Sequence, residues 1–289
     1  ACAGLARYLQ WVIDLVSRPG LAALPLESVY YRAWLVLIYA LLLVSIRGKG
    51  RRPVWMPLAA GTAGLVLAVV LTRETFGLGD IGVTVLDVGQ GQSVLVRTGN
   101  FFTLVDCGGD SRDDPGDVAA GYLQSLGRNQ IDLLVVSHYH SDHANGIPQL
   151  LNRVRVGEIA LPDVEEDAPL RAAILSAAAE KGIPVRLVRE DTRFALAEDR
   201  TVSVFAPVTE AGTTNELGLT VLAAVGQTEV LITGDMEQEG ELRLVESIPL
   251  PEVEILVAGH HGSETSTTPE LLETVQPRLA LISVGENNS

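Results

Sequence analysis

Cysteine is scarce in this sequence, and its placement excludes one class of fold. The 289 residues contain two cysteines, Cys2 and Cys107, which are too few and too far apart for a disulfide framework. Internal repeats and low-complexity segments are also lacking, so a repeat architecture is excluded. The sequence has neither an initiator methionine nor a signal-peptide pattern. We therefore expect it to be a fragment of a longer protein.

Basic residues are few, and they are concentrated near the N-terminus. The chain has 21 Lys and Arg against 36 Asp and Glu, a formal charge of −15. Residues 1–79 hold eight basic and three acidic residues, a charge of +5, whereas residues 80–289 carry −20. This change in charge, in a chain that is 47% hydrophobic, predicts a membrane region over residues 1–79 and a separate domain over residues 80–289.

Charge is missing altogether from VWMPLAAGTAGLVLAVVLT, residues 54–72. This length is close to the roughly 20 residues with which a helix crosses a hydrocarbon core. Residues 29–46 reach similar length, with Arg32 near one end, where its side chain can extend to the interface. Both segments are expected to be transmembrane helices, and a pair of buried core helices is the alternative. Apolar residues at helical spacing over residues 4–18 predict a helix that lies in the membrane interface.

The short loop between these segments sets their expected orientation. RGKGRR, residues 47–52, carries four cations in six residues. By the positive-inside rule this loop is cytoplasmic. The second segment then runs outward. We therefore expect a multi-pass protein of the cell membrane whose C-terminal domain lies on the extracytoplasmic side.

Residues 80–289 show the pattern of one α/β domain. Short β-branched runs separated by Gly and Asn come first and predict hairpins. Strands and helices then alternate, which predicts two sheets covered by helices. The expected strands are residues 81–88, 93–97, 101–107, 131–137, 158–161, 185–188, 201–205, 217–225, 229–233, 253–258 and 279–284. The expected helices are residues 118–126, 147–154, 170–181, 238–247 and 269–275.

Three of the five histidines crowd into SHYHSDHANG, directly after the apolar run IDLLVV. Sheets in α/β proteins commonly bind ligands at the carboxyl ends of their strands. In extended or turn geometry His138 and His140 point to the same side and can share one metal ion, while Asp142 and His143 turn toward a second. Imidazole and carboxylate suit zinc, manganese or iron. Four such groups beside a buried strand favour a metal site over an ordinary polar loop.

Two further strand ends carry the same kinds of residue. Asp235 follows the apolar run VLIT, and His260 and His261 follow the run ILVA. A carboxylate at Asp235 that touches two ions would hold them about 3.5 to 4 Å apart. Alternatively, Asp235 caps a helix that begins at Met236. We expect Asp142, Asp235 and His261 to be catalytic.

Several motifs, in order along residues 80–289, resemble one protein family. They are LDVGQGQSVLV, LVDCGG, SHYHSDHANG, NELGLTVL, VLITGD, AGHHGSETST and ISVGENN. Coming after membrane helices, they are similar to the ComEC family of DNA-internalisation competence proteins, whose soluble domain resembles the metallo-β-lactamase superfamily. The resemblance implies an αββα sandwich that holds two divalent metal ions, manganese or zinc.

The resemblance also implies roles for individual residues. The implied ligands are His138, His140 and His260 for the first ion, Asp142 and His143 for the second, and Asp235 as the bridge. Asp106 and Asn215 would lie behind the ligands or face the substrate, or be ordinary strand-end and turn residues. Gln92 departs from the family, whose first motif ends in aspartate. A later Tyr-Gly-His-Pro motif of the family, which would complete the second metal site, is not found before Ser289, so we expect that site to be incomplete.

The resemblance implies a nuclease that degrades one strand of DNA during natural transformation, together with the membrane and other DNA-uptake proteins. Paired metal ions suit phosphodiester hydrolysis, because they activate water and neutralise phosphoryl charge. The charge of −20 on residues 80–289 argues against a duplex-binding face, which is normally basic. Two alternatives stay open: a non-catalytic DNA-binding or transport subunit, and another outward-facing metallohydrolase, such as a phosphorylcholine esterase or a lactonase.

Overall fold

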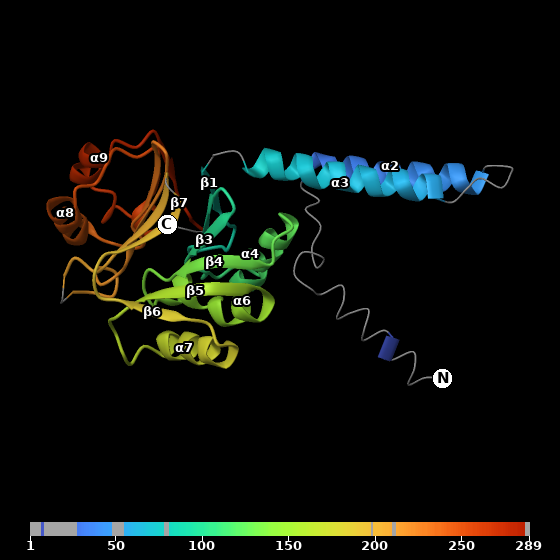
Figure 1. Cartoon of the computed structure of the whole chain (residues 1–289). Coiled ribbons are helices and arrows are strands. Elements are labelled where there is room, and N and C mark those ends of the chain that lie inside the picture. Colours follow the sequence, from blue (N-terminus) through green and yellow to red (C-terminus); the bar gives the residue numbers. More distant parts are fainter. Residues whose placement is uncertain are drawn as a thin grey trace. The chain divides into compact units, whose positions relative to one another are not determined.

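The computed structural model describes residues 7–8, 28–47, 55–77, 81–197, 199–209 and 212–286. Contacts divide the chain into two compact units, residues 1–78 with residues 121–129, and residues 79–120 with residues 130–289 (Figure 1). The interfacial helix expected over residues 4–18 lies outside the described residues, apart from residues 7–8. Most of the basic loop, residues 48–52, also lies outside them.

Two long helices of the first unit coincide with the expected apolar segments. They are α2 (Val29–Arg47) and α3 (Trp55–Gly77). The helices approach closely at Gly61, where an added β-carbon would lie 2.8 Å from the Ile38 side chain. The indole N–H of Trp34 donates to the Gly61 carbonyl at 2.9 Å. Both helices are long and apolar enough to cross a membrane, and only 6% and 17% of their apolar windows are buried within the described structure.

The first sheet of the second unit has six strands in the described part of the chain. They are β1 (Ile81–Val85), β2 (Val94–Thr98), β3 (Phe101–Val105), β4 (Gln130–Val135), β5 (Arg155–Pro162) and β6 (Val185–Val188), in that order across the sheet. β1, β2 and β3 pair antiparallel, and β3 to β6 pair parallel. The connecting helices are α4 (Pro115–Ser125), α5 (Ser141–Ala144), α6 (Ile147–Arg153) and α7 (Pro169–Lys181).

The second sheet also has six strands among the described residues. They are β7 (Thr192–Ala197), β8 (Arg200–Phe205), β9 (Thr220–Val225), β10 (Thr228–Ile232), β11 (Ile255–Val257) and β12 (Leu279–Leu281), again in sequence order. β7 to β10 form an antiparallel meander, and β10, β11 and β12 are parallel. Helices α8 (Gln238–Ser247) and α9 (Pro269–Val275) connect the parallel strands.

The main core lies between the two sheets. Successive strand residues face opposite sides. On β10, Val230 and Ile232 join a fully buried cluster with Val135 of β4, whereas Leu231 packs on the opposite face with Leu271 of α9. Figure 1 shows α6 and α7 on the outer side of the first sheet, and α8 and α9 on the outer side of the second. The expected αββα sandwich is thereby confirmed.

The observed strands end earlier than the predicted ones at the positions that matter for the site. β1 and β3 stop at Val85 and Val105, so that Asp106 lies beyond the ladder in a loop. One strand, β7, was not predicted from its mixed sequence TRFALA, and it is held by pairing with β8. The one-turn helix α5 inside the histidine motif was not predicted either.

Candidate metal centre

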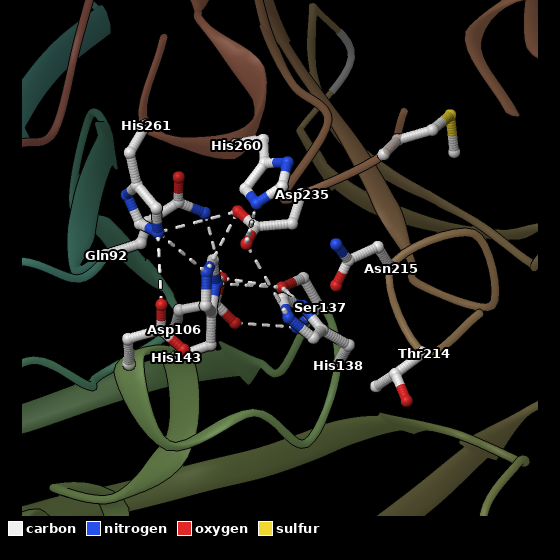
Figure 2. Close-up of polar contacts among 12 residues, drawn as sticks. Gln92, Asp106, Ser137, His138, His143, Thr214, Asn215, Asp235, His260 and His261 are labelled. Carbon is white, nitrogen blue, oxygen red and sulfur yellow. Dashed lines mark hydrogen bonds and ion pairs between the residues drawn. The ribbon is translucent and has the colours of Figure 1, made fainter. Parts of the chain in front are cut away.

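The predicted metal ligands lie at the carboxyl ends of strands from both sheets (Figure 2). Residues 137–140 follow the end of β4, and α5 begins directly after them. Asp235 follows β10 after Gly234, which adopts φ 62°. The 3-10 turn η1 (Gly259–Gly262) follows β11. Because β10 and β11 are parallel, their carboxyl ends meet at one edge and bring Asp235 close to the two histidines of η1.

Asp142, His143, Asp235 and His261 form a group whose ligand atoms all lie within 4.8 Å of one another. Nε2 of His143 is 3.0 Å from Oδ1 of Asp235 and 3.3 Å from Nε2 of His261. Nε2 of His261 is 3.4 Å from Oδ2 of Asp142. Ligand bonds of about 2.0–2.2 Å around one ion place its donor atoms at separations of this order.

A second set of histidines faces the other oxygen of Asp235. Oδ2 of Asp235 is 3.9 Å from Nε2 of His138 and 3.9 Å from Nε2 of His260. The rings of His138 and His140 meet edge to face, with centroids 4.7 Å apart. His138 is fully buried, whereas His140 is exposed. Asp235 therefore stands between the two sets and turns one carboxylate oxygen toward each.

Burial and charge act against each other on these groups. Burial, assisted by the neighbouring His143, lowers the pKa of His138 well below its usual value. Burial alone would also lower the pKa of His143, but the carboxylates of Asp106 and Asp235 raise it to about 10. Burial would raise the pKa of Asp235, but His143 lowers it to about 2. Without a cation, the two carboxylates beside the His143 ring thus favour its protonated form.

Asp106 holds His143 from the side that faces away from Asp235. Its Oδ2 lies 2.8 Å from Nδ1 of His143, and it also accepts the amide N–H of Gln92 at 2.8 Å. Ser137 donates its backbone N–H to Oδ1 at 2.6 Å and lies with its hydroxyl 2.7 Å from Oδ2. A carboxylate accepts about four hydrogen bonds, so the fully buried Asp106 is satisfied. Such a carboxylate behind a histidine fixes the direction of its other nitrogen.

His261 is held in a comparable way by a backbone group. Its Nδ1 lies 2.9 Å from the carbonyl oxygen of Ser283, and the Ser283 hydroxyl donates to the Gly91 carbonyl at 2.6 Å. His260 and His261 adopt φ 49° and 55°. Left-handed conformations of this kind cost about 1–3 kcal/mol each in a residue other than glycine, and they cluster at functional sites.

The structure adds one histidine to the second predicted group of ligands. We expected His260 to join His138 and His140, the group with Asp142 and His143 to be short of a ligand, and His261 to be catalytic. His261 lies in the group with Asp142, His143 and Asp235, which gives that group four donors. His260 also lies near Asp235, and its side chain is 31% exposed. The left-handed turn at η1 separates these two adjacent side chains, because it directs each ring to a different oxygen of Asp235.

Two other predicted residues have clear surroundings. Asn215 lies beside the second set of histidines (Figure 2), with its amide nitrogen 3.4 Å from Oε1 of Glu237. The capping alternative for Asp235 does not match the structure, because α8 begins at Gln238 and its N-cap residue is Glu237. The Asp235 side chain lies among histidines rather than at the helix end.

Sequence reasoning missed three residues of this network. Ser137 begins the histidine motif, so its position was a usable signal. Gln92 was noticed only as a departure from a family pattern, although its amide binds Asp106. Ser283 lies 22 residues from His261 and has no local signal, since its contribution is a backbone carbonyl.

Comparison with known proteins identifies the family of this chain. The sequence profile of the metallo-beta-lactamase superfamily matches residues 86–286. The chain belongs to the metallo-beta-lactamase superfamily. The crystal structure of the metallo-beta-lactamase fold protein YhfI from Bacillus subtilis matches with a TM-score of 0.50 at 15% identity, over 73% of this chain and 89% of that one. That likeness supports the fold alone.

Two curated relatives carry names from bacterial competence. Competence protein ComA of Neisseria gonorrhoeae is 32% identical over 284 residues, which are 98% of this chain and 37% of that protein. ComE operon protein 3 of Bacillus subtilis is 29% identical over 222 residues, which are 71% of this chain and 28% of that protein. The resemblance to the ComEC family is confirmed. The chain spans less than two-fifths of the length of either relative.

The residues of this metallo-beta-lactamase domain fit divalent metal ions. Imidazole nitrogens and carboxylate oxygens are the ligands that zinc, iron and manganese take in proteins. Among the described residues, Nε2 of His138 and Oδ1 of Asn215 are buried at this site without a hydrogen-bond partner. Buried polar atoms are normally satisfied, so two such atoms at one site favour a bound cation.

Proposed function

We propose that this chain is a membrane-anchored, metal-dependent hydrolase that cleaves phosphodiester bonds in one strand of DNA during DNA uptake. The observation that carries the proposal is the double arrangement about Asp235, with four donor atoms within 4.8 Å on one side and further histidines on the other. Two metal positions joined by one carboxylate suit in-line displacement at phosphorus. The names of the two relatives support DNA as the substrate and other DNA-uptake proteins as partners.

Each part of the site has a task in this proposal. Two divalent ions, manganese or zinc, would when bound activate water and neutralise charge on the phosphoryl group. The residues that would hold them are Asp142, His143, Asp235 and His261 for one ion, and His138, His140, His260 and again Asp235 for the other. Asp106 and the Ser283 carbonyl orient the rings of His143 and His261. Burial of His138, His143 and Asp235 excludes bulk water from their surroundings, which strengthens their electrostatic interactions.

The surroundings of the site are acidic, which bears on how DNA is bound. Glu237 lies 3.6 Å from Nδ1 of His260, and it lines a hollow of about 570 Å³ together with Glu216, Glu239 and Glu264. Carboxylates repel a phosphate backbone, which proteins usually bind with Lys and Arg. Phosphate binding is therefore assigned to the metal ions, and single-stranded DNA should bind weakly in their absence.

The proposal places α2 and α3 in the cell membrane and the hydrolase domain on its extracytoplasmic side. Both helices have the required length and composition, and most of their apolar surface is unburied. The basic loop over residues 47–52 supports a cytoplasmic connection between them.

Asp235→Asn is the sharpest test, because asparagine keeps the size of the side chain but removes the negative charge that the two groups of metal ligands share. The protein purified in detergent should cleave single-stranded DNA with manganese or zinc, and the variant should be slower by roughly 10²-fold or more. Glu158→Gln changes a partly exposed carboxylate that pairs with Arg186 and lies outside the acidic hollow, and as the matched control it should cleave at the parent rate. Thermal melting of both variants confirms that they are folded.

Other outcomes point to other functions. A parent protein that binds DNA but never cleaves it, with any ion, is a DNA-binding or transport subunit. Cleavage of a phosphorylcholine ester or a lactone, but not of DNA, identifies a different metallohydrolase. A folded Asp235→Asn variant that cuts DNA at the parent rate contradicts the two-metal mechanism.

A further inference from the structure

The hydroxyl group of Ser137 lies between a carboxylate and a histidine ring (Figure 2). Its Oγ is 2.7 Å from Oδ2 of Asp106 and 3.0 Å from Nδ1 of His138, and all three residues are buried. A longer contact of 3.3 Å joins Oγ to Nδ1 of His143. The backbone of Ser137 is held separately, since its N–H donates to Asp106 and its carbonyl accepts the N–H of Leu219 at 2.8 Å. The hydroxyl therefore has a fixed position between its partners.

The direction of these hydrogen bonds follows from the available protons. The Gln92 amide N–H and the Ser137 backbone N–H can only donate, and both point at the Asp106 carboxylate, which is therefore the acceptor. The single hydroxyl proton of Ser137 also goes to this charged acceptor. Oγ then offers only lone pairs to His138, so Nδ1 of that ring carries the proton. Nε2 of His138 is left unprotonated, and this atom lies 3.9 Å from Oδ2 of Asp235.

We propose that Ser137 is a positioning residue that fixes the tautomer of His138. One carboxylate, Asp106, then orients two histidines, His143 directly and His138 through the serine hydroxyl. A metal-binding histidine usually donates its other N–H to a carboxylate, a backbone carbonyl or water, and here a serine hydroxyl takes that place. The consequence for metal binding rests on the function proposed above. The tautomer itself does not depend on it.

Ser137→Ala tests the inference in the metal-free protein by long-range proton–nitrogen NMR. The chain has five histidines, which is few enough to resolve both nitrogens of each ring. The parent should show His138 protonated at Nδ1 and unprotonated at Nε2. In the variant we expect a mixture of both tautomers at His138, whereas His143 keeps its Nδ1 proton because Asp106 still accepts it. Metal affinity should fall by roughly 10-fold or more.

Ser266→Ala is the matched control. Ser266 is also buried, but its hydroxyl donates to the backbone carbonyl of Met236 at 2.8 Å, so its removal should leave the tautomer of His138 and the metal affinity unchanged. If the alanine variant of Ser137 fails to fold, Ser137→Cys gives the same readout, because a thiol is close in size and its sulfur accepts only weakly from the Nδ1 proton of His138.

Two results would overturn the inference. One is a folded Ser137→Ala variant whose His138 keeps the parent tautomer. The other is a parent whose His138 is protonated at Nε2. The spectra need no substrate and no metal. A parent that does not cleave DNA therefore contradicts the proposed function, while the tautomer pattern still decides the role of Ser137.

Discussion

Asp106 is a buried carboxylate whose backbone adopts φ 62°. This left-handed region is unusual for most residues, but aspartate and asparagine occupy it more often than others. Its oxygens meet donors from Gln92, Ser137 and His143. The position therefore suits a charged acceptor on a left-handed backbone. Asparagine also tolerates this backbone conformation but carries no charge, so its substitution tests the role of the charge alone.

Asp106→Asn should weaken metal binding. The new amide nitrogen would meet the donors of Gln92 and His143 in place of an acceptor, so His143 would lose its fixed direction. We expect metal affinity to fall by roughly 10- to 100-fold and stability to fall by about 1–3 kcal/mol. Competition with a chromophoric chelator measures the affinity. Asp163→Asn is the control, because that carboxylate pairs with Arg171. Parent-like affinity in Asp106→Asn would contradict the role given to Asp106.

Helix α8 holds the loop that follows η1. Glu241 of α8 is fully buried and accepts the backbone N–H groups of Thr267 at 2.8 Å and Thr268 at 2.7 Å. Thr268 in turn caps α9, because its side chain accepts the N–H of Leu271. Burial raises the pKa of Glu241, although these N–H donors favour its charged form. One buried side chain thus links α8, the loop and α9 beside the two-histidine turn.

Glu241→Ala should destabilise this part of the domain. Two buried N–H groups would lose their acceptor, and each unsatisfied group costs about 1–3 kcal/mol. We expect a loss of about 2 kcal/mol or more in the free energy of unfolding. Glu239→Ala, on the exposed side of the same helix, should change it by less than about 0.5 kcal/mol. Chemical denaturation followed by circular dichroism compares the two variants. Equal midpoints would show that the hydrogen bonds of Glu241 contribute little to stability.

Charge and apolar surface are segregated over the whole molecule. Residues 1–79 carry +5 and include two apolar helices whose surfaces are largely unburied, whereas residues 80–289 carry −20. An apolar helix surface is stable in hydrocarbon, and a strongly acidic domain is stable in water. The two parts of the chain thus suit different surroundings, which supports the proposal that the helices lie in a membrane and the domain in water.

Cysteine labelling in intact cells tests the orientation. Single cysteines replace Gly48 in the basic loop and Glu180, which is exposed on α7, in a chain whose Cys2 is changed to serine. A membrane-impermeant maleimide should label Glu180→Cys and leave Gly48→Cys unlabelled until the cells are permeabilised. Native Cys107 is buried and should stay unreactive throughout. The reverse labelling pattern would invert the proposed topology.

The sequence by itself determined the features that depend on neighbouring residues. Apolar runs of helical length predicted α2 and α3, and short β-branched runs predicted most strands and the two-sheet sandwich, because side-chain periodicity reports which face is buried. The spacing of His138, His140, Asp142 and His143 predicted a metal site, because these ligand types lie within six residues of one another in the sequence. β7 escaped prediction because its pairing with β8 stabilises it more than its own composition does.

Only the tertiary structure decided which side chains share the site. His261 joins His143 across 118 residues, and the choice between His261 and His260 depends on a left-handed turn and on the carbonyl of Ser283. The network around Asp106 likewise joins side chains from three separate segments. Contacts of this kind depend on how the two sheets pack and where their strands end. Local periodicity carries no record of that arrangement, because it reflects only which face of each element is buried.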